Sequence, residues 1–136
     1  MERELTGAEA GFLSDARVGH LATVRMGEWP HVVPVCHVLD LDRIVIASSD
    51  DRKVSDIRDN ASVTYCVDRY SEDWAELAQV IVSGEAYLIE SGPEWERDRA
   101  LLYEKFPQYP DVSPIDEGST LIIEFRIRDV TSSGLS

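Results

Sequence analysis

The sequence predicts a single mainly β domain, a small six-stranded antiparallel β-barrel with helices attached to its outside. Short runs that alternate apolar and polar residues are joined mostly by short turns, as in barrels that close a sheet upon itself. The first two runs form a hairpin, which excludes a parallel sheet that needs a helix after every strand. A chain of 136 residues holds one core, so we expect one domain over residues 1–136.

The first part of the chain predicts a helix followed by three strands. Thr6 and Glu9 are spaced as in a capping box, and Phe12 and Leu13 give the following helix an apolar face. The expected strands are 17–25, 29–39 and 43–48.

The apolar period then becomes helical. It predicts a short helix over 52–60 with Asp50 or Asp51 as its cap. Alternation returns at 62–69, and a capped helical turn is expected at 71–74. A long strand follows at 77–90, in which Gly84 indicates a bulge or a bend.

The last part predicts one longer helix and one strand. Residues 91–94 have a second capping-box pattern and begin a helix that extends to about Phe106. Its expected buried stripe is Trp95, Leu102 and Phe106. Three prolines then predict an irregular surface connection: Pro107, Pro110 and Pro114. In the final strand, from Leu121, only Ile122 breaks the alternation of inside and outside positions.

The charge of the chain limits its partners. It has 26 acidic against 13 basic residues, a formal net charge of −13, so it lacks the basic footprint that nucleic acid or an anionic membrane requires. Dispersed acids with only two lysines, Lys53 and Lys105, are typical of salt-accumulating microbes, and we expect a halophilic source. Without a bilayer-length apolar segment or a signal-peptide core, we expect a cytoplasmic protein.

Cysteines and histidines do not predict a metal site. Cys36 and Cys66 lie in apolar strand patterns, which favours buried free thiols over a disulfide or a metal pair. His31 and His37 share one side of their predicted strand but would be about 20 Å apart. His20 is interpreted as a partly buried structural histidine, and His31 is the candidate general acid.

Residues 48–53 suit a phosphate group. Two serines end a strand, helix N-terminal amides follow, and Arg52 and Lys53 add positive charge. A structural interpretation stays open and is favoured by composition alone. In that interpretation the second serine and Asp50 cap the helix, while Lys53 offsets Asp50 and Asp51.

Pro34 lies in the middle of the second predicted strand, which begins with Trp29-Pro30-His31. Proline cannot donate a ladder hydrogen bond, so an interior strand avoids it unless that backbone faces something else. A bound planar cofactor or a partner subunit would be such a neighbour.

The order of these motifs resembles the pyridoxamine 5′-phosphate oxidase-like split β-barrels, which bind FMN or the deazaflavin F-420. A hairpin comes first, with WPHVVPV on its second strand. IVIASS follows on the third strand, and RKVSDIRDNASVTYCVD comes after it. DRYSEDW and the later FPQY are similar to the F-420-dependent branch. The similarity covers residues 12 to about 130.

The resemblance implies a homodimer with two flavin-type cofactors, FMN or F-420, in grooves between the subunits. The resemblance implies that the ring system lies against the backbone of Val33, Pro34 and Val35. It implies that the cofactor phosphate contacts Ser48, Ser49, Arg52 and Lys53. It also implies that Arg69 and Trp74 reach the cofactor or substrate pocket of the partner subunit. For Trp74 ordinary dimer packing stays open. For Arg69 the alternative is a salt bridge to Glu72 or Asp73.

The implied activity is that of an oxidoreductase, with hydride transfer to or from a small organic substrate at the dimer groove. In such an enzyme the protein orients the cofactor and excludes water. A protein of the same fold that binds or carries a flavin, a deazaflavin or another planar ligand without turnover is the alternative. A dimeric scaffold without a cofactor is the third possibility, and the sequence assigns no catalytic residue.

Overall fold

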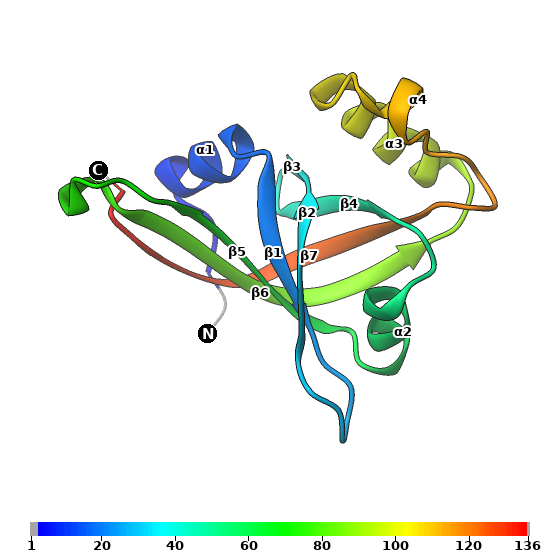
Figure 1. Cartoon of the computed structure of the whole chain (residues 1–136), viewed down its shortest axis with the longest axis horizontal. Coiled ribbons are helices and arrows are strands. Elements are labelled where there is room, and N and C mark those ends of the chain that lie inside the picture. The colour runs from blue at the N-terminus through cyan, green and yellow to red at the C-terminus, as the bar shows by residue number, and fades with distance from the viewer. Residues whose placement is uncertain (1–2, 136) are drawn as a thin grey trace.

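The computed structural model describes residues 3–135 as one antiparallel sheet of seven strands, curled into a half-open barrel (Figure 1). The strand order is β2-β1-β5-β6-β7-β4-β3. The strands are β1 (Val18–Thr23), β2 (His31–Cys36), β3 (Val38–Asp40), β4 (Arg43–Ser48), β5 (Ser62–Arg69), β6 (Ala78–Ile89) and β7 (Leu121–Ser133). The mainly β, split-barrel fold class is confirmed, with seven strands in place of six.

The additional strand arises because the predicted strand over 29–39 is broken at His37. Before the break, β2 pairs with β1; after it, β3 pairs with β4. These two short strands stand at opposite ends of the strand order, so one segment of chain supplies both edges of the sheet. The sheet therefore curls until β2 approaches β4.

His37 is fully buried at this break and all its polar groups are bonded. Burial lowers its pKa to about 4, so the imidazole is neutral at physiological pH. Its Nε2–H donates to the Leu13 carbonyl at 2.7 Å, and its Nδ1 accepts from the Tyr65 hydroxyl at 2.6 Å. Its backbone N–H donates to the Arg17 carbonyl, and Lys105 Nζ donates to its carbonyl oxygen.

The helices lie outside the sheet: α1 (Gly7–Asp15), α2 (Arg52–Asp59), the 3₁₀ turn η1 (Trp74–Glu76), α3 (Pro93–Lys105) and α4 (Tyr109–Val112). The capping box of α1 is confirmed, since Thr6 and Glu9 each accept from the other's backbone N–H. The second capping box is wrong: α3 is preceded by Gly92 at φ 99°, without a side-chain cap. The proline-rich connection after α3 is also not wholly irregular, because it contains α4.

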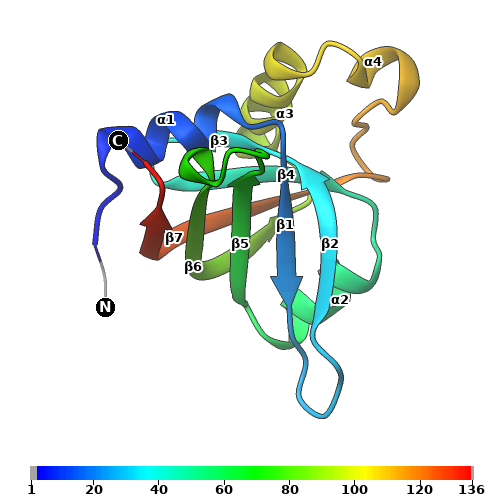
Figure 2. The same ribbon diagram turned by 60° about the vertical axis from the view of Figure 1, so that its left-hand side comes forward.

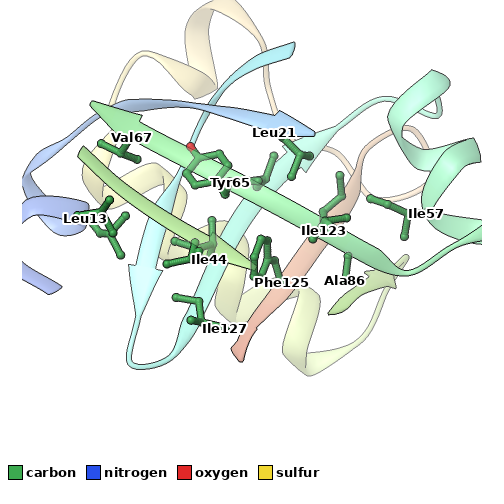
Figure 3. Close-up of a cluster of buried hydrophobic side chains, with 14 of the residues drawn as sticks. Leu13, Leu21, Ile44, Ile57, Tyr65, Val67, Ala86, Ile123, Phe125 and Ile127 are labelled. Carbon is green, nitrogen blue, oxygen red and sulfur yellow. The ribbon is translucent and has the colours of Figure 1, made fainter. Parts of the chain in front are cut away.

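The main core fills the concave side of the sheet (Figure 3). Leu21, Tyr65 and Phe125 are fully buried there, from three different strands. The bulge predicted at Gly84 is confirmed by a register shift between Ser83 and Gly84 in the β6–β7 ladder. A Cβ at that glycine would collide with the Arg126 carbonyl.

A second buried cluster lies between α3 and the other side of β4 and β7. The predicted stripe of Trp95, Leu102 and Phe106 is confirmed as buried. Ile122 belongs to this cluster, which explains why it breaks the alternation of β7: both sides of the strand are covered at that end.

Asp98 of α3 and Glu124 of β7 form a buried acid pair beneath the helix. Asp98 is fully buried, and Arg43 Nη1 lies 2.5 Å from Glu124 Oε1. Burial, and then the hydrogen bond with Glu124, raise the pKa of Asp98 to about 7. Burial opposes ionisation of Glu124 as well, but the bonds from Asp98 and Arg43 lower its pKa. Asp98 is therefore the member that holds the proton, and Arg97 and Asp40 complete the charged surroundings.

Asp98→Asn is expected to stabilise the protein at alkaline pH. Because the folded-state pKa of Asp98 lies above its ordinary value of 3.8, the stabilisation from its protonated form is complete below that value and is lost as the pH rises through about 7. An asparagine keeps a donor toward Glu124 without ionising, so the free energy of unfolding at pH 8 should rise by about 1–2 kcal/mol.

Urea unfolding of both proteins from pH 4.5 to 8 measures this effect, with Glu96→Gln on the exposed side of the same helix as the control. A difference between Asp98→Asn and wild type that stays constant across this range would contradict the assignment of the proton.

Tyr65→Phe is expected to destabilise the fold by about 1–3 kcal/mol, because it leaves the buried Nδ1 of His37 without its donor. Tyr87→Phe is the matched control, since the Tyr87 side chain is 48% exposed. Equal midpoints of urea unfolding for the two variants would show that the hydrogen bond to His37 contributes nothing to stability.

Candidate functional site

The β1–β2 hairpin projects from the sheet, and α2 lies beside its base (Figure 2). Asp56 of α2 is fully buried and accepts from the Thr23 hydroxyl at 2.8 Å. Its carboxylate also lies 3.5 Å from Arg25 Nε and 3.6 Å from Arg52 Nε. Arg52 Nη2 donates to the Trp29 carbonyl at 3.0 Å. The start of α2 is thereby tied to the entrance of β2, which places the predicted phosphate residues beside the predicted ring strand.

Three of the predicted phosphate residues already have bonding partners: Ser48, Arg52 and Lys53. Ser48 is buried and its hydroxyl donates to the carbonyl of Ser49, whose own side chain is exposed. Lys53 Nζ lies 2.5 Å from Asp51 Oδ2, and the Lys53 side chain is 12% exposed. Burial opposes ionisation of Asp51, but the bond from Lys53 keeps its pKa below the ordinary value. An anion would therefore have to displace the Asp51 carboxylate from Lys53.

The structural interpretation of this segment is confirmed in part. Its capping residues are wrong: Asp51, rather than Ser49 or Asp50, occupies the N-cap position of α2, and its side chain makes no capping hydrogen bond. Lys53 offsets Asp51, whereas Asp50 pairs with Arg58 at the other end of the helix, at 2.9 Å.

Three buried polar atoms at the hairpin base have no hydrogen-bond partner among the described residues: Arg25 Nε, His31 Nδ1 and Asp56 Oδ1. They lie close together because Thr23 pairs with His31 across the hairpin and donates to Asp56. Buried polar groups are nearly always satisfied, by protein or by another molecule. Arg25 Nε and Asp56 Oδ1 lie 3.5 Å from each other as an ion pair, so His31 Nδ1 is the atom of the three that could bond to a polar group reaching this point.

β2 is an edge strand of the sheet, which is where proline is tolerated. The edge position accounts for Pro34 without any ligand. Val33 and Val35 face the core side, paired with Leu21 and Gly19, whereas Pro34 is exposed on the other face. The backbone edge that the sequence predicts to lie against a ring system is thus the free margin of the barrel.

Arg69 and Trp74 lie far from the phosphate residues within one chain. They follow the end of β5 opposite to α2, and an eight-residue strand spans roughly 23 Å. Arg69 Nε donates to the Glu76 carbonyl at 2.9 Å and its guanidinium lies over the Phe12 ring, rather than forming the expected ion pair with residue 72 or 73. The Trp74 side chain is 73% exposed.

On the convex side, where β2, β1, β5 and β6 lie side by side (Figure 2), the central part of the sheet has no charged side chain and is bounded by Asp68 of β5 and Glu85 of β6. Its members, taken from the strand register, are Val18, His20, Ala22, Val32, Pro34, Thr64, Cys66, Ile81 and Ser83. A groove of about 440 Å³ crosses the hairpin end of this face. The expected burial of His20 is wrong, because the core side of β1 carries Gly19 and Leu21 and His20 is exposed on the convex face.

The remaining expectations concern metals, thiols and membranes. Within residues 3–135 no cluster of three or more histidine, cysteine or acidic side chains could hold a metal ion. Cys36 and Cys66 are free, as expected, but half-buried rather than buried. Over the same residues no helix is long and apolar enough to cross a membrane.

The sequence does not indicate the groups that the fold adds to this site. Asp56, Thr23 and Arg25 come from separate elements, and each has the appearance of a surface residue in its own segment. The helical spacing of Val54 and Ile57 is the one available signal for Asp56, because it places the residue next to the buried face of α2.

A family model described as pyridoxamine 5′-phosphate oxidase matches residues 10–133. No curated protein matches the chain. Many solved structures share the fold, and the three described below are 16–22% identical to this chain.

Three of these structures illustrate the similarity, and the descriptions of two of them name a ligand. A FAD-binding protein of Mesorhizobium loti is 22% identical, with a TM-score of 0.79, over 97% of this chain and 95% of its own. A heme storage protein of Vibrio cholerae is 16% identical, with a TM-score of 0.81, over 98% of both chains. A conserved hypothetical protein of Mycobacterium tuberculosis is 18% identical, with a TM-score of 0.79, over 97% of this chain and 88% of its own.

Proposed function

The chain belongs to the pyridoxamine 5′-phosphate oxidase family, and from this membership we propose that it is an oxidoreductase that binds FMN or the deazaflavin F-420. The cofactor's phosphate binds at the start of α2 and its ring system along the edge of β2. A bound flavin or deazaflavin supplies hydride transfer to or from a small organic substrate.

The observation that carries this proposal is the junction of α2 with the entrance of β2. The Arg52–Trp29 hydrogen bond holds the arginine and lysine of the helix start beside a free strand edge, where His31 Nδ1 is buried without a hydrogen-bond partner among the described residues. Arg52 and Lys53 attract the phosphate, Ser48 and Ser49 offer hydroxyls to it, and the β2 backbone orients the ring. His31, with its unpartnered Nδ1 at the same place, remains the candidate proton donor.

We further propose that two copies associate through the uncharged convex face. In a chain with net charge −13, a wide exposed area without a charged side chain favours contact with a second copy over contact with water. This arrangement would let Arg69 and Trp74 of one subunit approach the phosphate end of the other, which they do not reach within their own chain. The cytoplasmic location and the halophilic source stay predictions.

A binding or carrier protein without turnover is the second candidate. The structural similarity to a heme storage protein favours it, since that protein has the same fold over the whole chain. His20 is an exposed imidazole in the middle of the convex face, and imidazole is a common axial ligand of heme iron.

Titration of the purified protein with FMN, F-420 and heme, followed by visible absorption, tests both candidates. Saturable binding of FMN or F-420 is expected, and oxidation of the reduced cofactor by members of a substrate panel would distinguish an enzyme from a carrier. Binding of heme alone would establish the second candidate and contradict the first.

Lys53 and Asp51 provide opposite variants for the phosphate contact. Lys53→Ala should weaken cofactor binding about tenfold, a loss of about 1.4 kcal/mol, because one charge-assisted hydrogen bond is removed. Asp51→Asn should strengthen binding, because it frees Lys53 from its ion pair. Arg58→Ala, at the far end of the same helix, is the control. Equal affinities for all three variants would contradict the phosphate assignment.

Val32→Glu should convert a dimer to monomers, because it places a charge in the uncharged face at a side chain that is 59% exposed. Leu41→Glu, 85% exposed on the β3–β4 turn, is the control with the same added charge. Sedimentation of the variants measures the change. A wild-type protein that is monomeric at micromolar concentration would contradict the proposed association.

A further inference from the structure

A small apolar hollow lies beyond the C-terminal end of β2, between that strand and α4. Its volume is about 280 Å³, near the lower limit of about 300 Å³ for small-molecule sites. It is lined by Cys36, Phe106, Gln108, Tyr109, Val112 and Ser113. This size suits one small ring compound rather than a peptide.

The aromatic wall of the hollow is formed before any ligand binds. Phe106 and Tyr109 meet edge to face, with ring centroids 5.8 Å apart and planes at 84°. Tyr103 stacks behind Tyr109 with its plane at 28°, and its hydroxyl accepts from the Ile115 N–H at 2.9 Å. A rigid aromatic wall favours a planar ring over a flexible chain, because little side-chain freedom is lost on binding.

The charged groups around the hollow indicate which charge a bound ring compound should carry. None of the six lining residues is acidic, although the chain has 26 acids, and Asp111 of α4 is not among them. The cationic groups of Arg17 and Lys105 each lie 5.5 Å from the centroid of Phe106. Burial, and then the charge of Arg17, lower the pKa of Lys105, and its Nζ donates to the carbonyls of Ala16 and His37. Arg17 is therefore the stronger of the two cations beside the Phe106 wall. An anionic ring is favoured over a cationic one.

Hydrogen-bond donors are available around this hollow. Burial raises the pKa of Tyr109, which keeps its phenol protonated and able to donate. Gln108 and Ser113 lie at the exposed mouth, with an amide and a hydroxyl. A carboxylate on the ring would find donors there.

The hollow adjoins the proposed ring site. Cys36 lies two residues beyond Pro34 on the same strand, about 7 Å away by strand rise. A ligand in the hollow would therefore lie next to a ring system held along β2.

We propose that this hollow binds the ring of a small aromatic carboxylate, as the substrate subsite beside the cofactor. The role as a substrate subsite rests on the proposed oxidoreductase function, whereas binding itself requires only the aromatic wall, the donors and the nearby cations.

Ligand-observed NMR with benzoate tests binding directly, with and without FMN. Benzoate is expected to bind, and cyclohexanecarboxylate and benzylammonium, which lack the flat ring or the negative charge, are expected to bind more weakly. Val112→Glu should abolish benzoate binding, because it adds a carboxylate at the mouth where the side chain is 81% exposed. Met26→Glu adds the same charge at the 93%-exposed hairpin tip and should leave binding unchanged.

Alkylation of Cys36 in a Cys66→Ser background locates the ligand. Benzoate at about twice its dissociation constant should slow alkylation about threefold by simple occupancy. Equal binding of benzoate to wild type and Val112→Glu, or no protection of Cys36, would overturn the proposal. Competition between FMN and benzoate for binding would place the cofactor ring itself in the hollow and would also overturn it. Benzoate binding in a protein that takes up no flavin would support the subsite and contradict only the oxidoreductase function.

Discussion

The break in the strand at His37 is the constraint on which the rest of the structure depends. Because Tyr65 and the Leu13 carbonyl satisfy both ring nitrogens, the chain can turn there without leaving a buried polar atom unpaired. β2 and β3 then leave in different directions and become the two edges of one sheet. Gly19 is part of the same arrangement, since a Cβ there would collide with the Tyr65 ring.

The break also determines where ligands can approach. An edge strand keeps its outer backbone groups free, and β2 runs from the cationic start of α2 at one end to the aromatic hollow beside α4 at the other. Both ends are fastened to elements distant in sequence, through Arg52 to Trp29 and through Lys105 to His37. The open edge is therefore held at a fixed distance from the start of α2, where we propose that a phosphate binds, and from the apolar hollow beside α4.

Local patterns predicted much of the fold, and tertiary contacts decided the rest. β4 and β5 have the predicted bounds because their alternation is complete within each strand. The break at His37 could not be predicted, since residues 29–39 read as one apolar run and the partners of His37 lie at Leu13 and Tyr65. In the site, residues 48–53 lie together because they are adjacent along the chain, and their binding of a phosphate stays a prediction. The Lys53–Asp51 pair was anticipated only as an alternative, because composition does not show which acid a lysine selects.

Charge placement separates structural from functional features in this acidic chain. The buried acids Asp56 and Asp98 each lie beside arginines and fasten a helix to the sheet, so they are explained by the fold. The central part of the convex face and the hollow beside α4 are different, because no acid is among the residues that form them. If the 26 acids were placed at random among the 136 residues, about one surface position in five would carry an acidic side chain. Two adjoining uncharged regions flanking one free strand edge are therefore better explained by contacts made there than by solubility, which favours charge at every exposed position.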